Sequence, residues 1–133
     1  MGAASNYLEA KLLDHALGTT SFTKPTTVYV ALHTSDPGEA GSFSAEVGTS
    51  GTAYSRKAVT FAAASSGSAA SNSTVTFDAA TSSWGTITHI SICDGATAGA
   101  GQILFFGSVT ASKTIDSGDT FQITSGNLTV SLD

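Results

Sequence analysis

The side chains of this sequence best suited to metal binding or nucleophilic catalysis are three histidines and one cysteine: His15, His33, His89 and Cys93. No two of the histidines stand at the spacing of an H-x-H or H-E-x-x-H motif, so the sequence predicts no metal site. His15 falls near the C-terminal end of a predicted helix, where a cation is mildly favoured. His33 and His89 fall in different predicted strands, and we expect them on the strand surface or at a subunit contact.

Cys93 ends an apolar stretch and has no cationic neighbour in the sequence. Because a thiol nucleophile needs a lowered pKa, which a nearby cation usually provides, we expect a buried structural cysteine. The chain has neither a G-x-S-x-G nucleophile elbow nor a glycine-rich phosphate loop. Several aspartates stand in predicted turns, where they usually bond to their own backbone. The sequence therefore predicts no cofactor, no catalytic residue and no enzymatic activity.

The charge balance and the apolar runs exclude several classes of partner. Only five residues are Lys or Arg and the formal net charge is −5, too few basic residues for a surface that follows nucleic acid phosphates. No apolar run approaches the ~20 residues that span a bilayer. Glu9, Lys11 and Asp14 interrupt any apolar core of a secretory signal. The single cysteine fits a chain made in a reducing cytoplasm.

The apolar content is barely sufficient for a core. Leu, Ile, Val and Phe together account for 28 of the 133 residues, just above the roughly 20 per cent below which chains tend to stay disordered. The length favours a single domain over residues 1–133. A thin core also indicates that assembly contributes to stability, because binding restricted to the folded state adds to it.

Residues 1–18 are predicted to form an arm and a helix. Ser5 or Asn6 can cap the helix, and Asn6 with Glu9 has the spacing of a capping box. An apolar stripe follows at helical spacing, formed by Leu8, Leu12, Leu13, Ala16 and Leu17. We expect the stripe to cover a sheet of its own domain. The alternative is an oligomeric or host-surface contact, with the flexible residues 1–5 ordering on docking.

The rest of the chain alternates short apolar segments with turns. Period-two alternation predicts strands at residues 28–33, 54–61, 75–77, 84–93, 103–109, 121–123 and 128–132. This spacing predicts an all-β fold: an antiparallel β-sandwich or jelly-roll-like domain over residues 26–133, with one N-terminal α-helix. Two stretches rich in small residues are predicted as loops. They are residues 62–72 and an exposed excursion at 39–53, for which Phe43 and Val47 are plausible anchors.

Two large side chains have alternative roles. Trp84 precedes a strand, where it fits a core plug or, as the alternative, an interface anchor. Arg56 is the only arginine, and on its predicted strand it either reaches solvent or pairs across an interface. Together with the helix, these residues define a candidate interface of Tyr7, Leu8, Leu12, Arg56 and Trp84.

Blocks of residues along nearly the whole chain match a known pattern. They are residues 6–9, 11–15 and 17–18, then 28–32 with Thr34, Asp36 and Pro37, then 54–56, 58–61, 75–77, 84–89, Ile92, Asp94, 117–119, 128–130 and 132–133. In this order they resemble a family of small virion structural proteins of tailed bacteriophages, often labelled tail fibre-like proteins. The small-residue stretches at 39–53 and 62–72 stay outside the match, and the resemblance implies no catalytic residues.

The resemblance implies a structural component of the virion, made in the cytoplasm of a bacterial host. The first expectation is a capsid decoration, or cement, protein that bridges capsid subunits. The alternative is a small tail or tail-fibre-associated protein. A tail-associated glycan hydrolase comes third, because it needs a pair of positioned carboxylates. The expected partners are the major capsid protein or other virion proteins and further copies of the chain, a trimer being favoured, with neither nucleic acid nor membrane.

Overall fold

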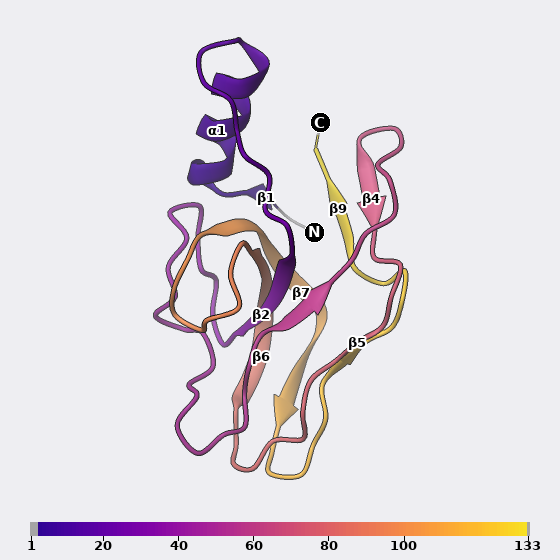
Figure 1. Cartoon of the computed structure of the whole chain (residues 1–133). Helices are drawn as coiled ribbons and strands as arrows, with labels where there is room; N and C mark the ends of the chain where they lie inside the picture. The colour runs from indigo at the N-terminus through magenta and orange to yellow at the C-terminus, as the bar shows by residue number, and fades with distance from the viewer. Residues whose placement is uncertain (1–2, 133) are drawn as a thin grey trace.

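Strands dominate the computed structural model, which describes residues 3–132, and one helix, α1 (Asn6–Ala16), lies near the N-terminus (Figure 1). The strands are β1 (Ala3–Ala4), β2 (Val28–His33), β3 (Lys57–Val59), β4 (Ser68–Ala70), β5 (Val75–Thr76), β6 (Gly85–Cys93), β7 (Ile103–Ile115), β8 (Gln122–Ile123) and β9 (Thr129–Ser131). Within the described residues these strands pair antiparallel. The predicted all-β fold with one N-terminal helix is therefore confirmed.

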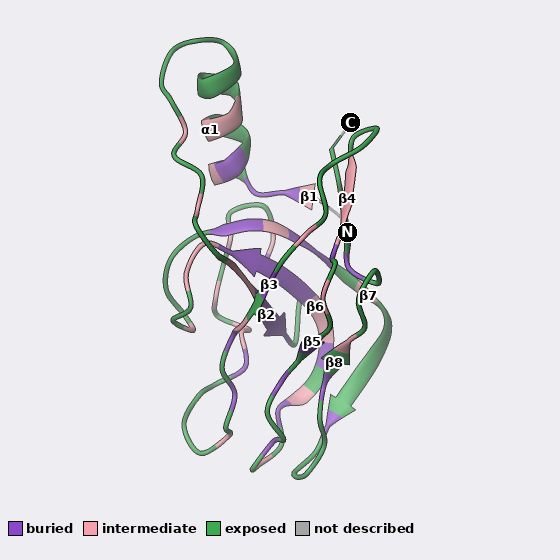
Figure 2. Ribbon diagram, turned by 45° about the vertical axis from the view of Figure 1, so that its right-hand side comes forward, coloured by how far each residue is buried: buried purple, intermediate pink, exposed green. Residues whose placement is uncertain are grey.

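Five strands form the main sheet, in the order β1–β7–β6–β2–β3, and the pairs β4–β9 and β5–β8 form two smaller sheets. The core fills the space between them. Leu32 of β2 and Ile92 of β6 belong to one buried cluster with Val75 of β5, Phe121 and Leu128. Figure 2 shows this burial along β2, β6 and the first half of β7. A chain with few large apolar residues thus concentrates them between its sheets, where each one is removed from water.

Aromatic rings fill the centre of this core. The ring of Phe77 lies 5.8 Å from that of Phe121 and 6.3 Å from that of Trp84, both edge to face. Tyr54 stacks on Phe77 and meets Trp84 edge to face. The indole N–H of Trp84 donates to the carbonyl of Thr52 at 2.8 Å, which satisfies its polar atom inside the protein. Trp84 therefore lies in the core, the first of its two predicted roles.

The N-terminal arm is part of the main sheet. β1 pairs with Phe105 and Phe106 of β7, so the expectation that residues 1–5 order only on docking is wrong for residues 3–5; Met1 and Gly2 lie outside the described residues. The arm joins the sheet because β7 presents an unpaired edge there. The prediction of Ser5 as helix cap is confirmed, since its Oγ accepts from the N–H of Leu8 at 3.2 Å and donates to the carbonyl of Ile103.

Ser5→Ala is expected to lower the free energy of unfolding by about 2 kcal/mol. The change removes the helix cap and leaves the buried carbonyl of Ile103 without the hydrogen bond from Ser5. Urea unfolding followed by circular dichroism measures the loss. Ser125→Ala is the matched control, since Ser125 is exposed, and its effect is expected to stay within about 0.5 kcal/mol. Equal stability of the two variants would contradict the role given to Ser5.

Several strand boundaries differ from the prediction. β1 and β4 were predicted as arm and loop, because their Ala and Ser residues carry no apolar alternation. β7 continues to Ile115 through polar residues that alternation does not detect. The predicted strand 54–61 shortens to β3. The excursion at 39–53 is not simply exposed, because it bridges to β2 at Glu46 and buries Val47 in the core.

Candidate functional site

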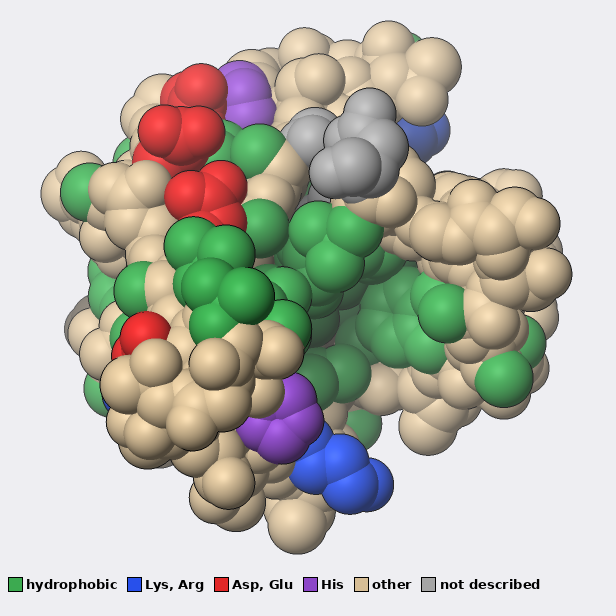
Figure 3. Space-filling model, turned by 90° about the horizontal axis from the view of Figure 1, so that it is seen from above, with side chains coloured by type: hydrophobic (Ala, Val, Ile, Leu, Met, Phe, Trp, Pro, Cys, Tyr) green, Lys and Arg blue, Asp and Glu red, His purple; other side chains and the backbone are tan. Residues whose placement is uncertain are grey.

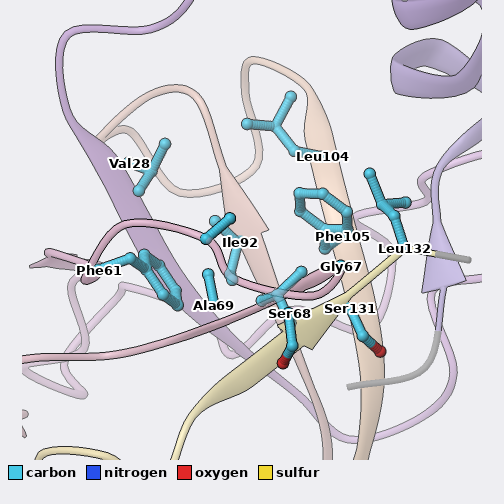
Figure 4. A pocket seen from close by; sticks show the side chains of 12 residues that line it. Val28, Phe61, Gly67, Ser68, Ala69, Ile92, Leu104, Phe105, Ser131 and Leu132 are labelled. Atoms are coloured by element: carbon cyan, nitrogen blue, oxygen red, sulfur yellow. The ribbon is translucent and has the colours of Figure 1, made fainter.

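An apolar hollow opens at the end of the molecule that carries α1 and the C-terminal strand, and Figure 3 looks into it from above. Its volume is about 330 Å³. The side chains in Figure 4 come from β2, β4, β6, β7 and β9 and from the chain before β4; the apolar ones among them include Val28, Phe61, Ala69, Ile92, Leu104, Phe105, Val130 and Leu132. No charged residue of the described chain lines the hollow.

The hollow exists because the wall facing the main sheet is built from small residues. Ala64, Gly67, Ser68 and Ala69 lie in the small-residue stretch 62–72 and carry too few atoms to reach the opposite side chains. Gly67 is held close to the C-terminal strand, since an added Cβ would lie 2.7 Å from the carbonyl oxygen of Leu132. The stretch predicted as a plain loop therefore forms one wall of the apolar hollow.

Three leucines are exposed in the described chain, and one of them, Leu132, lines the hollow. Leu13, Leu17 and Leu132 are 60, 76 and 49 per cent exposed and are the large hydrophobic residues found exposed within residues 3–132. A second depression shares Ser131 and Leu132 with the hollow and is also lined by Glu9, Leu12 and Leu13 of α1. We call the hollow, together with Leu13 and Leu132, the apical apolar surface. Exposed apolar surface of this kind is a candidate interaction site.

A buried ion pair lies away from that surface. The guanidinium of Arg56 donates to both carboxylate oxygens of Glu46, at 2.9 and 2.8 Å, and the two side chains are 0 and 2 per cent exposed. Arg56 also donates to the carbonyls of Gly95 and Ala100. Its guanidinium carbon lies 4.9 Å from the ring centroid of Phe43. Arg56 thus joins the 39–53 segment to the loop between β6 and β7, within its own chain.

The carboxylate of Glu46 is fully used by this network. Besides the Arg56 contacts it accepts from the hydroxyl of Tyr54 at 2.7 Å and from the N–H of Gly99 at 2.8 Å. Burial by itself would raise the pKa of Glu46, but the hydrogen bonds from Arg56, Tyr54 and Gly99 hold that pKa below its usual value. Burial, next to this carboxylate, raises the pKa of Tyr54. The arrangement favours a fixed structural pair over a group that exchanges protons with a substrate.

A second buried polar group contains two of the residues considered for chemistry. His33 Nε2 lies 2.7 Å from Ser91 Oγ, which lies 3.4 Å from Cys93 Sγ. All three residues are fully buried, so the expectation of a surface position for His33 is wrong. Both faces of β2 are covered, which period-two alternation does not show. Burial is the main cause that lowers the pKa of His33 to about 4 and raises the pKa of the Cys93 thiol. The prediction of a buried cysteine is confirmed.

The five residues of the candidate interface are not brought together. Leu8 packs against Ala4 and Leu104 under α1, with Tyr7 and Leu12 half-buried beside it. Trp84 lies in the core, and Arg56 makes its ion pair inside the chain rather than reaching solvent or pairing across an interface. The reason is that Glu46, ten positions earlier, folds back onto Arg56. A carboxylate and an arginine in separate loops give no sequence signal of pairing.

Within residues 3–132, no group of three or more His, Cys, Asp or Glu side chains is placed to hold a metal ion. No helix in this part of the chain has the length and apolar character needed to cross a membrane.

The described chain is thus a module of antiparallel sheets with a buried ion pair and an apolar hollow at one end. The sequence model of the family described as Podophage GP4 fiber I protein gp80 matches residues 3–131. The chain therefore belongs to this family of phage fibre proteins, which confirms the resemblance to virion structural proteins of tailed phages. No curated protein matches the chain.

Proposed function

We propose that this protein is a small structural component of a podophage fibre and that it acts by binding other virion components. The observation that carries the proposal is the match to a fibre protein family over residues 3–131. The alternative drawn from the sequence, a tail-fibre-associated protein, is thereby favoured over capsid decoration, for which no specific observation speaks.

The fold supports a binding role through the apical apolar surface. Large side chains are buried in most of the described chain, yet Leu132 stays half-exposed at the uncharged hollow and Leu13 stays exposed in the depression beside it. Exposing this surface costs free energy in water, and a partner that covers it recovers that free energy. The pairing of β4 with β9 and of β6 with β7 holds in place the strands that line the hollow.

Copy number and location in the virion test the proposal. Purified virions are analysed by quantitative gel densitometry against the major capsid protein, and antibodies to this chain are located by electron microscopy. A fibre component is expected at three to a few dozen copies, with labelling on fibres at the tail or neck. Hundreds of copies spread over the head would contradict the proposal and restore capsid decoration. Absence of the chain from virions would contradict both.

A further inference from the structure

We propose that a groove along the free edge of β7 takes an extended strand of a different protein, and that this strand carries a carboxylate side chain. The groove is separate from the apical apolar surface, and its partner does not depend on the place of the protein in the virion. An unpaired strand edge, a groove that follows this edge and one unpaired cation carry the proposal.

The edge of β7 that faces away from β6 is paired over only a short distance. β1 pairs with Phe105 and Phe106, and the main sheet has no further strand on that side within the described chain. The rest of the edge, residues 107–115, therefore has no partner strand there. On the side of β6 the register shifts, because the residues between Ser108 and Lys113 have only Thr88 opposite them. Unpaired N–H and C=O groups of a strand edge are a template for a further strand.

A groove of about 520 Å³, which we call the lateral groove, follows this edge. One side is lined by the consecutive residues 108–111 of β7, and the other by residues 122–124 and 127–129. Successive strand residues point to opposite faces of a sheet, so a groove lined by consecutive residues lies at a strand edge and not over one face. β8 and β9 each have a single partner strand in the described chain, so the second side also offers an unpaired edge. Figure 2 shows the second half of β7 exposed beside β8.

The lining of the lateral groove suits a polypeptide strand. Ile90, Phe121 and Leu128 belong to the buried core and form its apolar part, while hydroxyl and amide side chains such as Thr110 and Asn127 form its polar part. In strand addition the main-chain hydrogen bonds give affinity, and alternate side chains of the added strand reach pockets that give specificity. The only aromatic residue of the lining, Phe121, is buried, so a ligand that stacks on an exposed ring has no platform here.

Charge selects the kind of strand. Lys113 is the only charged residue of the lining, it is exposed, and no ion pair within residues 3–132 includes it. A lysine on a strand edge guards it against a second copy, because two such edges would bring like charges into one interface. A strand of another protein that carries Asp or Glu brings the opposite charge instead. Lys113 therefore favours an acidic strand from a different protein.

Synthetic peptides test the proposal with the purified full-length chain. The probe is a fluorescein-labelled peptide of about nine residues, alternating Val and Thr around a central Glu, which spans the groove at ~3.3 Å per residue. Fluorescence anisotropy is expected to show saturable binding below ~100 µM. The same peptide N-methylated at its three central residues has the same side chains but lacks main-chain donors, so its affinity should fall about tenfold or more. No saturable binding of the unmodified peptide, or equal binding of the two, would overturn the proposal.

A charge reversal tests the role of Lys113. Lys113→Glu is expected to weaken binding of the Glu peptide about tenfold, because an attraction becomes a repulsion, and to strengthen binding of a peptide with a central Lys. Lys24→Glu is the matched control, since Lys24 is exposed, lies outside the lateral groove and changes the net charge equally. Equal effects of the two variants would overturn the proposal. Thermal unfolding confirms that both are folded.

Hydrogen exchange locates the bound peptide. The backbone amides of residues 108–114 are expected to exchange more slowly when the Glu peptide is bound, because strand addition covers this edge. Slower exchange confined to other parts of the chain would overturn the proposal. Slower exchange of residues 108–114 in the concentrated protein without peptide would also overturn it, since the edge would then belong to a second copy.

Discussion

Replacement of Arg56 by methionine is expected to lower the free energy of unfolding by about 3–5 kcal/mol, because the carboxylate of Glu46 is left buried without its counter-charge. The two side chains are 0 and 2 per cent exposed, so water cannot replace the lost partner without opening the structure. The same change removes the hydrogen bonds that Arg56 donates to the carbonyls of Gly95 and Ala100. Thermal unfolding measures the loss, expected as a fall in Tm of about 10–20 °C for a chain of this length.

A double mutant separates the energetic cost of the unpaired buried charge from the cost of lost packing. Glu46→Gln added to Arg56→Met removes the uncompensated charge. The amide oxygen can accept from the N–H of Gly99, and the amide N–H can donate to the hydroxyl oxygen of Tyr54. The double variant is therefore expected to be more stable than Arg56→Met alone, by about 1–2 kcal/mol. If it is less stable, the cost lies in packing and hydrogen bonds, and our account of Arg56 is wrong.

An exposed ion pair is the control for the Arg56 experiment. Lys57 Nζ lies 3.1 Å from Asp78 Oδ2, with side chains 27 and 65 per cent exposed. Asp78→Asn is expected to cost less than about 1 kcal/mol, since solvent screens such pairs. A loss comparable to that of Arg56→Met would show that burial does not set the difference.

Acidification from pH 6.5 to pH 4 is expected to destabilise the wild type by about 3 kcal/mol through His33 alone. Burial lowers the pKa of His33 to about 4, against the usual 6.5. Below pH 6.5 the unfolded chain binds a proton at His33 that the folded chain does not bind until about pH 4. Protonation therefore favours unfolding across this window, and above it the residue makes no pH-dependent contribution.

The groups that face His33 do not reverse this direction. Glu46 and Asp36 raise its pKa, Arg56 and His89 lower it, and burial outweighs them all. The lowered pKa of Glu46 also makes folding acid-sensitive, but its contribution is lost only as the pH falls below the usual glutamate value. The His33 effect therefore occupies the upper part of the acid range.

His33→Gln is the variant that isolates this effect. The glutamine amide can keep the hydrogen bond to Ser91 Oγ, and it does not titrate. Urea unfolding is measured at intervals from pH 7 to pH 4 for both proteins. The difference in stability between the two should change by about 3 kcal/mol over this range. Parallel curves would contradict the burial of His33 as the cause.

Much of the fold could be predicted because large apolar residues mark it. Val28, Val30 and Leu32 alternate in β2, and the helix begins at a Ser cap followed by leucines. The short strands β1 and β4 could not be predicted, because alanine and serine carry no hydrophobic pattern and their pairing depends on distant partners. The second half of β7 could not be predicted either, because its residues are polar. It is held by backbone pairing with β6 more than by burial.

The candidate site was predictable only in part. The helix stripe was recognised, but its division into a buried Leu8 and exposed Leu13 and Leu17 depends on which side of α1 meets β1 and β7. The hollow is lined by residues from five strands. No local spacing in the sequence shows that these strands come together. The burial of Arg56 follows from the return of the 39–53 segment onto it, and that return is a long-range event.

Local patterns in the sequence were enough to determine an all-β chain with one capped helix, an internal cysteine, and blocks matching phage structural proteins. These properties follow from the character and spacing of neighbouring residues. Only the tertiary structure decided that Arg56 and Glu46 face each other, that His33 lies inside, and that five strands line an uncharged hollow. Burial and pairing depend on which segments distant in the chain come to lie side by side, and that is settled when the sheets close over the core.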